Sequence, residues 1–230
     1  MMDPRQLFAD DRMLGACAYC GGPPATRDHV PSRVLLDEPF PDNLPVADCC
    51  ETCNNGFSLD EQYLACFIDC VLAGSTSPGD VARPKVARIF AETPALASRI
   101  AASETEGSID HQVWEPEIDR IHNVLLKLAR GHVAYELSSP QIDAPSSITC
   151  TPIIAMADRD VEHFLNPQEA ASWPEIGSRA FKRVCEQFSG SDADYWQVVQ
   201  PGRYQYLVGD DGSFVRILLS DYLAGEVRWD

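Results

Sequence analysis

The sequence predicts an α+β protein in which a cysteine-rich module precedes a mixed region of helices and strands. Seven of the nine cysteines lie between Cys17 and Cys70, and the later segments alternate between helical and strand-like periodicity. The 230 residues are 45% apolar and 23% charged, which are values of a globular chain. We expect a first module over residues 1–73, a linker over 74–82, and an α+β domain of unassigned role over 83–230.

Several local signals place the elements of the first module. The segment Cys20–Pro24 (CGGPP) predicts a tight turn, and four prolines exclude a long helix across residues 30–45. The segment Ser58–Glu61 fits the capping-box pattern S-x-x-E, so we expect Ser58 to cap a helix. The apolar residues that follow recur at helical spacing up to Gly74, where this helix should end.

The region after the linker predicts both helices and strands. Pro84 should begin a short helix, and Pro94 should interrupt it and start a second helical stretch to about Ala102. Residues 117–130 form an amphipathic helical pattern that we expect to end at Gly131. A buried strand over 148–156, a helix over 175–188, and strands over 195–199, 203–208 and 213–219 complete the prediction, with a hairpin turn at Asp211-Gly212.

The charge of the chain is strongly negative. Eighteen Lys and Arg residues stand against 35 Asp and Glu residues, which gives a net charge of −17 at pH 7. Non-specific binding of polyanions relies on Lys and Arg to replace counterions, so this composition argues against it. The sequence also lacks a secretory signal pattern and any apolar run near the ~20 residues of a membrane-spanning helix. We therefore expect a cytoplasmic protein without membrane association, whose cysteines are reduced thiols or metal ligands.

Two C-x-x-C pairs predict a structural zinc site. Cys17 with Cys20 and Cys50 with Cys53 can bring four thiolates to one tetrahedral Zn²⁺. The 29 residues between the pairs exceed the usual gap of roughly 15–20, so reduced core thiols or a redox pair are the alternatives. Cys49 is a rival ligand, but it would need C-x3-C spacing, and we favour Cys50.

The segment between the two pairs contains a further ordered set of polar residues. Asp28-His29-Val30-Pro31 follows the first pair, Asn43-Leu44 precedes the second, and Asn54 comes directly after Cys53, before the capped helix. Over residues 16–72 this order resembles the HNH endonucleases, whose fold is the ββα-metal motif.

The resemblance implies a role for each of these residues. His29 matches the general base, Asp28 the carboxylate that holds Mg²⁺ or Mn²⁺, Asn43 the residue that braces the histidine loop, and Asn54 the second ligand of the catalytic metal. Asn55 competes with Asn54 for that last role. A neutral imidazole suits a base near pH 7, and a hard divalent cation suits carboxylate and amide oxygens.

Two further residues bear on phosphate contacts. The family frequently has Lys where this chain has Phe57, so one contact lacks its usual residue. Arg33 is either a phosphate contact or an exposed, solvated side chain.

The leading functional hypothesis is therefore a metal-dependent HNH endonuclease that hydrolyses DNA. Because the chain is so acidic, we expect a partner such as an ATPase or DNA-binding subunit, or oligomerisation, to deliver the DNA. The resemblance implies a bacterial anti-phage or restriction-type system. The alternatives are a catalytically inactive, zinc-stapled module whose acidic surface meets a basic partner protein, and a nuclease that acts on RNA.

Overall fold

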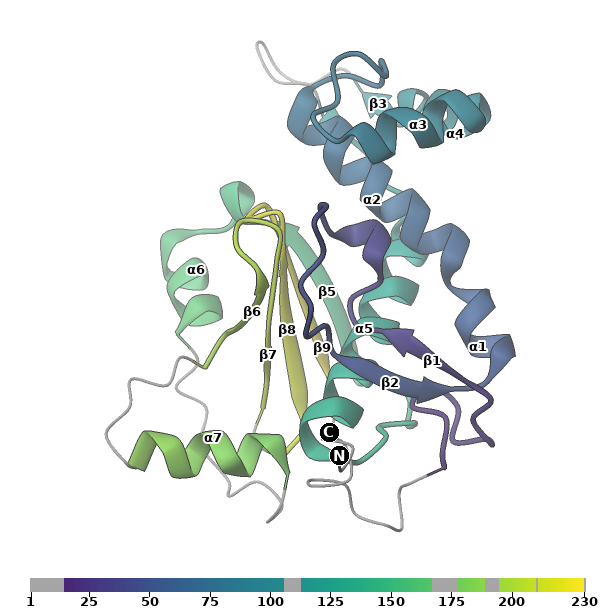
Figure 1. Cartoon of the computed structure of the whole chain (residues 1–230). Helices are drawn as coiled ribbons and strands as arrows, with labels where there is room; N and C mark the ends of the chain where they lie inside the picture. Colours follow the sequence, from purple (N-terminus) through teal and green to yellow (C-terminus); the bar gives the residue numbers. More distant parts are fainter. Residues whose placement is uncertain (1–14, 106–112, 167–177, 189–194, 210, 230) are drawn as a thin grey trace.

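The computed structural model describes residues 15–105, 113–166, 178–188, 195–209 and 211–229. It confirms an α+β fold, in which helices surround a small hairpin and a larger antiparallel sheet (Figure 1). Within these ranges, no helix is both long enough and apolar enough to cross a membrane.

The N-terminal part contains a hairpin and two consecutive helices. These elements are β1 (Thr26–His29), the 3₁₀ turn η2 (Arg33–Leu35), β2 (Val46–Cys49), α1 (Glu51–Gly56) and α2 (Ser58–Ala73). Helix α2 ends as predicted at Gly74, which has a left-handed φ of 60°. The predicted capping box is wrong, because α1 continues into α2 with Phe57 as the N-cap. The Ser58 hydroxyl instead donates to the carbonyl of Asn55.

The middle part is mainly helical. Its elements are α3 (Pro84–Glu92), α4 (Pro94–Ala101), β3 (Glu104–Thr105), β4 (Val113–Trp114) and α5 (Ile118–Leu137). Pro84 and Pro94 each stand at the start of a helix, as predicted. The predicted end of α5 at Gly131 is wrong, since the helix continues to Leu137. Gly131 has another role, because a Cβ there would lie 2.7 Å from Val30, next to β1.

The C-terminal part forms a five-stranded antiparallel sheet in the order β5-β9-β8-β7-β6. Its elements are β5 (Ser147–Pro152), η3 (Ile153–Ala155), α6 (Asp158–Leu165), α7 (Arg179–Phe188), β6 (Gln197–Gln200), β7 (Tyr204–Val208), β8 (Phe214–Leu219) and β9 (Leu223–Arg228). The predicted strand over 148–156 is shorter, because residues 153–155 form a 3₁₀ turn. Residues 175–177 of the predicted helix lie outside the described residues. Gly212 has a φ of 75° between β7 and β8, in agreement with the predicted turn.

Helix α5 lies between the hairpin and the sheet (Figure 1). One apolar cluster extends from Cys17 in the N-terminal module, through Leu125 and Leu128 of α5, to Val215 and Ile217 of β8. A second cluster covers the opposite face of the sheet under α6. The predicted boundary at 74–82 therefore separates two stretches of sequence that share one core.

Candidate functional site

The four predicted zinc ligands lie together. The Sγ atoms of Cys17, Cys20, Cys50 and Cys53 are all within 4.8 Å of one another. The Sγ atoms of Cys20 and Cys50 are 3.9 Å apart. A tetrahedral Zn²⁺ with Zn–S bonds of about 2.3 Å needs sulfur atoms roughly 3.8 Å apart. The cluster can therefore bind a metal ion such as zinc, and it confirms the choice of Cys50 over Cys49.

Two tight turns present these sulfur atoms. In the first turn, Gly21 has a left-handed φ of 72°. In the second, Cys50 is the N-cap of α1, and its Sγ accepts the N–H of Cys53 at 3.4 Å. The N–H of Ala18 donates to the carbonyl of Asp48 in β2 at 2.9 Å. The four-cysteine cluster is thereby attached to the hairpin, and a bound metal ion would hold the hairpin and α1 together.

The thiol of Cys17, inside the cysteine cluster, and that of Cys49, outside it, differ in pKa. Burial would raise the pKa of Cys17, but hydrogen bonds from backbone N–H groups, that of Cys50 first, lower it to about 7. A lowered pKa favours the thiolate, which is the form that binds zinc. Burial and the nearby Asp28 carboxylate raise the pKa of Cys49 to about 12. Cys49 is therefore a buried neutral thiol that packs in the core.

Asp28 and His29 are neighbours in β1, and their side chains leave opposite faces of the strand. Asp28 is 9% exposed. Its Oδ2 accepts a hydrogen bond from the Tyr19 hydroxyl at 2.7 Å and lies 2.6 Å from Nζ of Lys127 in α5. The carboxylate predicted to hold a divalent cation is thus paired with a lysine from a helix nearly 100 residues further along the chain.

The ammonium group of Lys127 is surrounded by oxygen atoms. Its side chain is 1% exposed, and Nζ lies 2.7 Å from Oε1 of Glu61 and 3.0 Å from Oγ of Ser32. The Ser32 hydroxyl also donates to Glu61 at 2.6 Å. We call Asp28, Glu61, Lys127 and Ser32 the lysine cage. Removing one partner of such a buried ion pair is strongly destabilising, because the remaining charge stays buried.

His29 is half-buried and lies against Arg33 of η2. The Arg33 guanidinium nitrogen is 3.3 Å from Nε2 of His29. A guanidinium can only donate, so Nε2 accepts and the ring proton is on Nδ1. Burial and the Arg33 charge lower the pKa of His29, and they outweigh the opposing effect of Asp28. The imidazole is therefore neutral at pH 7, as a general base must be.

The predicted asparagines occupy different places. Asn54 in α1 donates from Nδ2 to Oγ1 of Thr26 at 3.3 Å. Thr26 is two residues before Asp28, so both side chains leave the same face of β1. Asn55 is exposed, whereas Asn54 is half-buried and contacts Thr26. Asn43 lies exposed in the turn that leads into β2.

One of the oxygen atoms predicted to bind Mg²⁺ or Mn²⁺ is already engaged by other side chains. Oδ2 of Asp28 already contacts Lys127 and Tyr19, whereas Asn54 contacts Thr26 through its amide nitrogen and not through the amide oxygen that would bind a metal. Within the described residues, the four cysteines are the one group of His, Cys, Asp or Glu side chains placed to hold a metal. A divalent cation can bind Oδ2 of Asp28 only if Lys127 leaves that oxygen.

The lysine cage was not predicted from the sequence. The sequence pattern predicts Glu61 in a helix cap and Lys127 in an ordinary amphipathic helix. A signal exists in retrospect, because Gly131 follows Lys127 by one helical turn and lets that face of α5 approach the hairpin.

Comparison of the chain with family models, with curated proteins and with solved structures found no match. The resemblance to HNH endonucleases therefore depends on the sequence motifs alone.

Proposed function

We propose that this protein is an HNH-type endonuclease that hydrolyses phosphodiester bonds, with DNA as the substrate. The observation that carries the proposal is His29. It is a neutral imidazole with a lowered pKa, on a hairpin attached to a four-cysteine cluster, beside an exposed arginine. The order of zinc turn, Asp-His strand, zinc turn and Asn-bearing helix supports the same assignment.

In the proposed reaction, His29 takes a proton from water at Nε2. Arg33 donates to that nitrogen in the free protein. A phosphate oxygen is a stronger partner for a guanidinium than a neutral imidazole is, so a bound phosphate would draw Arg33 away and free Nε2. The resulting hydroxide attacks phosphorus, the bond to the leaving oxygen breaks, and that oxygen takes a proton from solvent.

A requirement for Mg²⁺ or Mn²⁺ remains a prediction. Because Asp28 is paired with Lys127, we derive no step through a divalent cation. If the metal acts at Asp28, activity should respond to added Mg²⁺ or Mn²⁺, and Asn54→Ala should need more metal than wild type. Equal metal dependence for wild type and Asn54→Ala would move the ligand role to Asn55.

We further propose that a partner delivers the DNA. The net charge of −17 weakens binding to free DNA at physiological salt. An ATPase or another DNA-binding subunit of an anti-phage or restriction-type system would supply the missing affinity and restrain cleavage until it is needed.

The proposal is tested with His29→Ala, with His122→Ala as the matched control. Cleavage of plasmid DNA at low salt should fall by roughly 10²–10⁴-fold in His29→Ala alone, the usual effect of a positioned base. Zinc content and thermal stability should stay the same. Since the pKa of His29 is lowered, wild-type activity should still hold at pH 6.5, where an ordinary imidazole is half protonated, and should decline only at lower pH, when His29 takes a proton. Equal cleavage by His29→Ala and wild type would refute this mechanism.

A second function has one observation in its favour. The pairing of Asp28 with Lys127 is what a catalytically inactive, zinc-stapled interaction module would show, because it stabilises the fold without leaving a free carboxylate. Zinc-loaded wild type that cleaves neither DNA nor RNA at low salt, with or without Mg²⁺ and Mn²⁺, would favour this module. Cleavage of RNA alone would instead identify a ribonuclease.

A further inference from the structure

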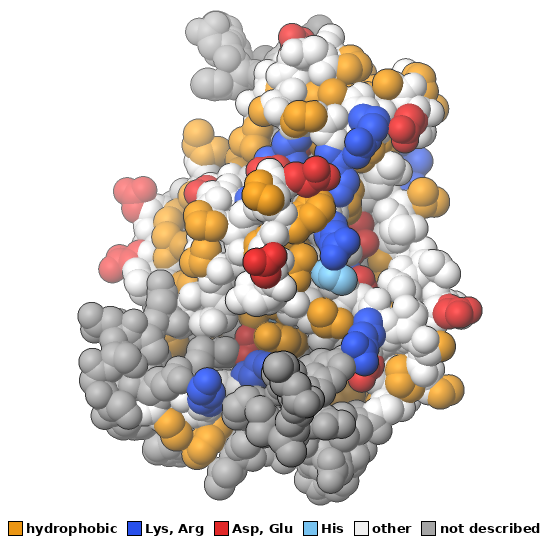
Figure 2. Space-filling view, in the orientation of Figure 1, with side chains coloured by type: hydrophobic (Ala, Val, Ile, Leu, Met, Phe, Trp, Pro, Cys, Tyr) orange, Lys and Arg blue, Asp and Glu red, His pale blue; other side chains and the backbone are white. Residues whose placement is uncertain are grey.

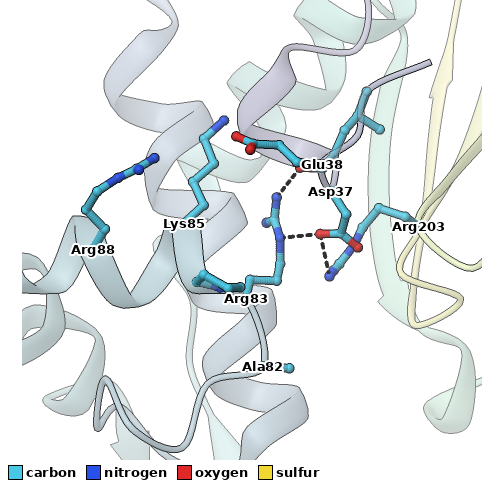
Figure 3. A pocket seen from close by; sticks show the side chains of 9 residues that line it. Asp37, Glu38, Ala82, Arg83, Lys85, Arg88 and Arg203 are labelled. Carbon is cyan, nitrogen blue, oxygen red and sulfur yellow. Dashed lines mark hydrogen bonds and ion pairs between the residues drawn. The ribbon is translucent and has the colours of Figure 1, made fainter.

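A pocket of about 300 Å³ lies between the segment after η2, the start of α3 and the turn before β7. Figure 3 shows four cationic side chains around it, which are Arg83, Lys85, Arg88 and Arg203. Asp37 and Glu38 are its acidic lining residues. A pocket with this excess of cations is unexpected on a chain with a net charge of −17.

The inner side of the pocket is a closed network of balanced charges. Asp37 binds Nε of Arg83 at 2.7 Å and Nε of Arg203 at 3.0 Å. Asp69 binds the same two arginines at 3.4 and 3.1 Å. Two arginines and two aspartates hold one another in place, so this part of the pocket is preformed and adds no net charge. Figure 3 shows the contacts of Asp37 with Arg83 and Arg203.

The mouth of the pocket carries the unbalanced charge. Lys85 and Arg88 stand on the first turns of α3, and in the described part of the chain neither has a carboxylate within 4.0 Å. Glu38 is an acidic lining residue whose charge acts on Lys85. Burial and the charges of Arg83, Arg88 and Arg33 lower the pKa of Lys85, although Glu38 opposes them. A bound anion would relieve this repulsion.

The cations at the mouth continue to His29. Nζ of Lys85 donates to the carbonyl of Arg33 at 3.0 Å, and Arg33 in turn contacts His29. Lys85 and Arg33 also lie over the ring of Phe40, at 5.3 and 5.5 Å from its centroid. Figure 2 shows Lys and Arg side chains gathered in a row on this face, with a histidine beside the row.

We propose that this pocket binds a phosphate group of the nucleic-acid strand whose neighbouring phosphodiester lies at His29. The proposal rests on the proposed function, and it assigns the contacts to Lys85, Arg88 and Arg33. It also explains how so acidic a chain binds a polyanion, because the cations that face the strand are collected in one row. About three phosphate contacts predict a slope of roughly −2.7 for log K against log salt on duplex DNA.

The test measures binding separately from cleavage. Full-length, zinc-loaded His29→Ala is titrated with a fluorescein-labelled DNA duplex over a range of salt concentrations, and anisotropy gives the affinity. Adding Lys85→Gln or Arg88→Gln should weaken binding and make the slope shallower by about 0.9 for each lost charge. Arg159→Gln, a 92%-exposed arginine on α6, is the matched control and should leave both unchanged.

Two competitors distinguish the chemical class of the ligand. Inorganic phosphate at constant ionic strength should compete with the duplex, whereas polyglutamate should compete far less. Equal competition by polyglutamate, an unchanged slope in Lys85→Gln and Arg88→Gln, or no binding at low salt would each overturn the proposal. Unchanged zinc content and melting temperature show that each variant folds.

This test and the test of function can fail independently. If the salt dependence of binding changes as expected in the variants but wild type cleaves nothing, the phosphate-binding proposal is supported and the nuclease proposal is refuted. If wild type cleaves, and Arg88→Gln binds and cleaves DNA as well as wild type does, the nuclease proposal is supported and the phosphate-binding proposal is refuted.

Discussion

The β1–β2 hairpin and the five-stranded sheet differ in what holds them together. All six residues of β8 are buried. Five of them are apolar and enter clusters on both faces of the sheet, and the sixth, Arg216, is paired with Glu226 of β9 at 2.6 Å. In β1, Asp28 is the one buried residue of four, and its carboxylate is paired with Lys127. The sheet therefore depends mainly on apolar burial around this ion pair between β8 and β9, whereas the hairpin depends mainly on the cysteine cluster and on buried charges. The proposed catalytic residue lies in the part with little apolar support of its own.

Metal removal should produce the largest difference between the two regions. Structural zinc in small domains supplies on the order of 10 kcal/mol of folding free energy. Chelation, or Cys50→Ser, should therefore expose the backbone amides of β1, β2 and α1 to hydrogen exchange, while those of β7, β8 and β9 stay protected. Hydrogen-exchange mass spectrometry and elemental analysis measure both effects.

Cys49→Ser is the control for metal removal, because Cys49 lies next to Cys50 but outside the cluster. This variant should keep its zinc and its protected hairpin. Loss of zinc in Cys49→Ser would show that the ligand set is wrong. Equal loss of protection in hairpin and sheet would show that both regions depend on the metal.

The features that could be predicted from the sequence are those set by residues close together along the chain. Two C-x-x-C turns predict their own ligand set, and Pro84 and Gly74 mark helix ends through their own backbone preferences. The lysine cage could not be predicted, because it joins Asp28 to Lys127 across about 100 residues and needs the packing of α5 on the hairpin. The pocket lined by Lys85 and Arg203 could not be predicted for the same reason, since these two residues come from distant segments of the chain.

Lys127→Met should have the second-largest effect. Without the ammonium, the carboxylates of Asp28 and Glu61 stay buried with no cation between them, and such a loss costs about 3–5 kcal/mol. Urea denaturation of the zinc-saturated protein measures it. The triple variant Asp28→Asn/Glu61→Gln/Lys127→Met, which removes the charges together, should recover most of the loss. If Lys127→Met alone were as stable as wild type, the lysine cage would contribute nothing to the stability of the hairpin.

Lys127→Met also tests whether Lys127 or a divalent cation binds the carboxylate of Asp28. With Lys127 replaced by Met, the oxygens of Asp28, Glu61 and Ser32 become available to a hard divalent cation. Added Mn²⁺ should then raise the melting temperature of zinc-saturated Lys127→Met and leave that of wild type unchanged. An equal rise in wild type would mean that Mn²⁺ displaces Lys127, as the HNH resemblance implies.

Gly131→Ala should have the smallest effect, and it tests the contact through which α5 joins the two regions. A Cβ at Gly131 would lie 2.7 and 2.9 Å from the two γ carbons of Val30, which is fully buried beside His29. Alanine gains about 1 kcal/mol over glycine within a helix, but overpacking a core costs about 1–3 kcal/mol. We therefore expect a net loss of about 1 kcal/mol in urea denaturation. In Gly56→Ala the same change meets no atom within 4 Å, so that variant should lose no stability. If Gly131→Ala were instead the more stable of the two, α5 would not press against Val30, and the hairpin would not take its position from this helix.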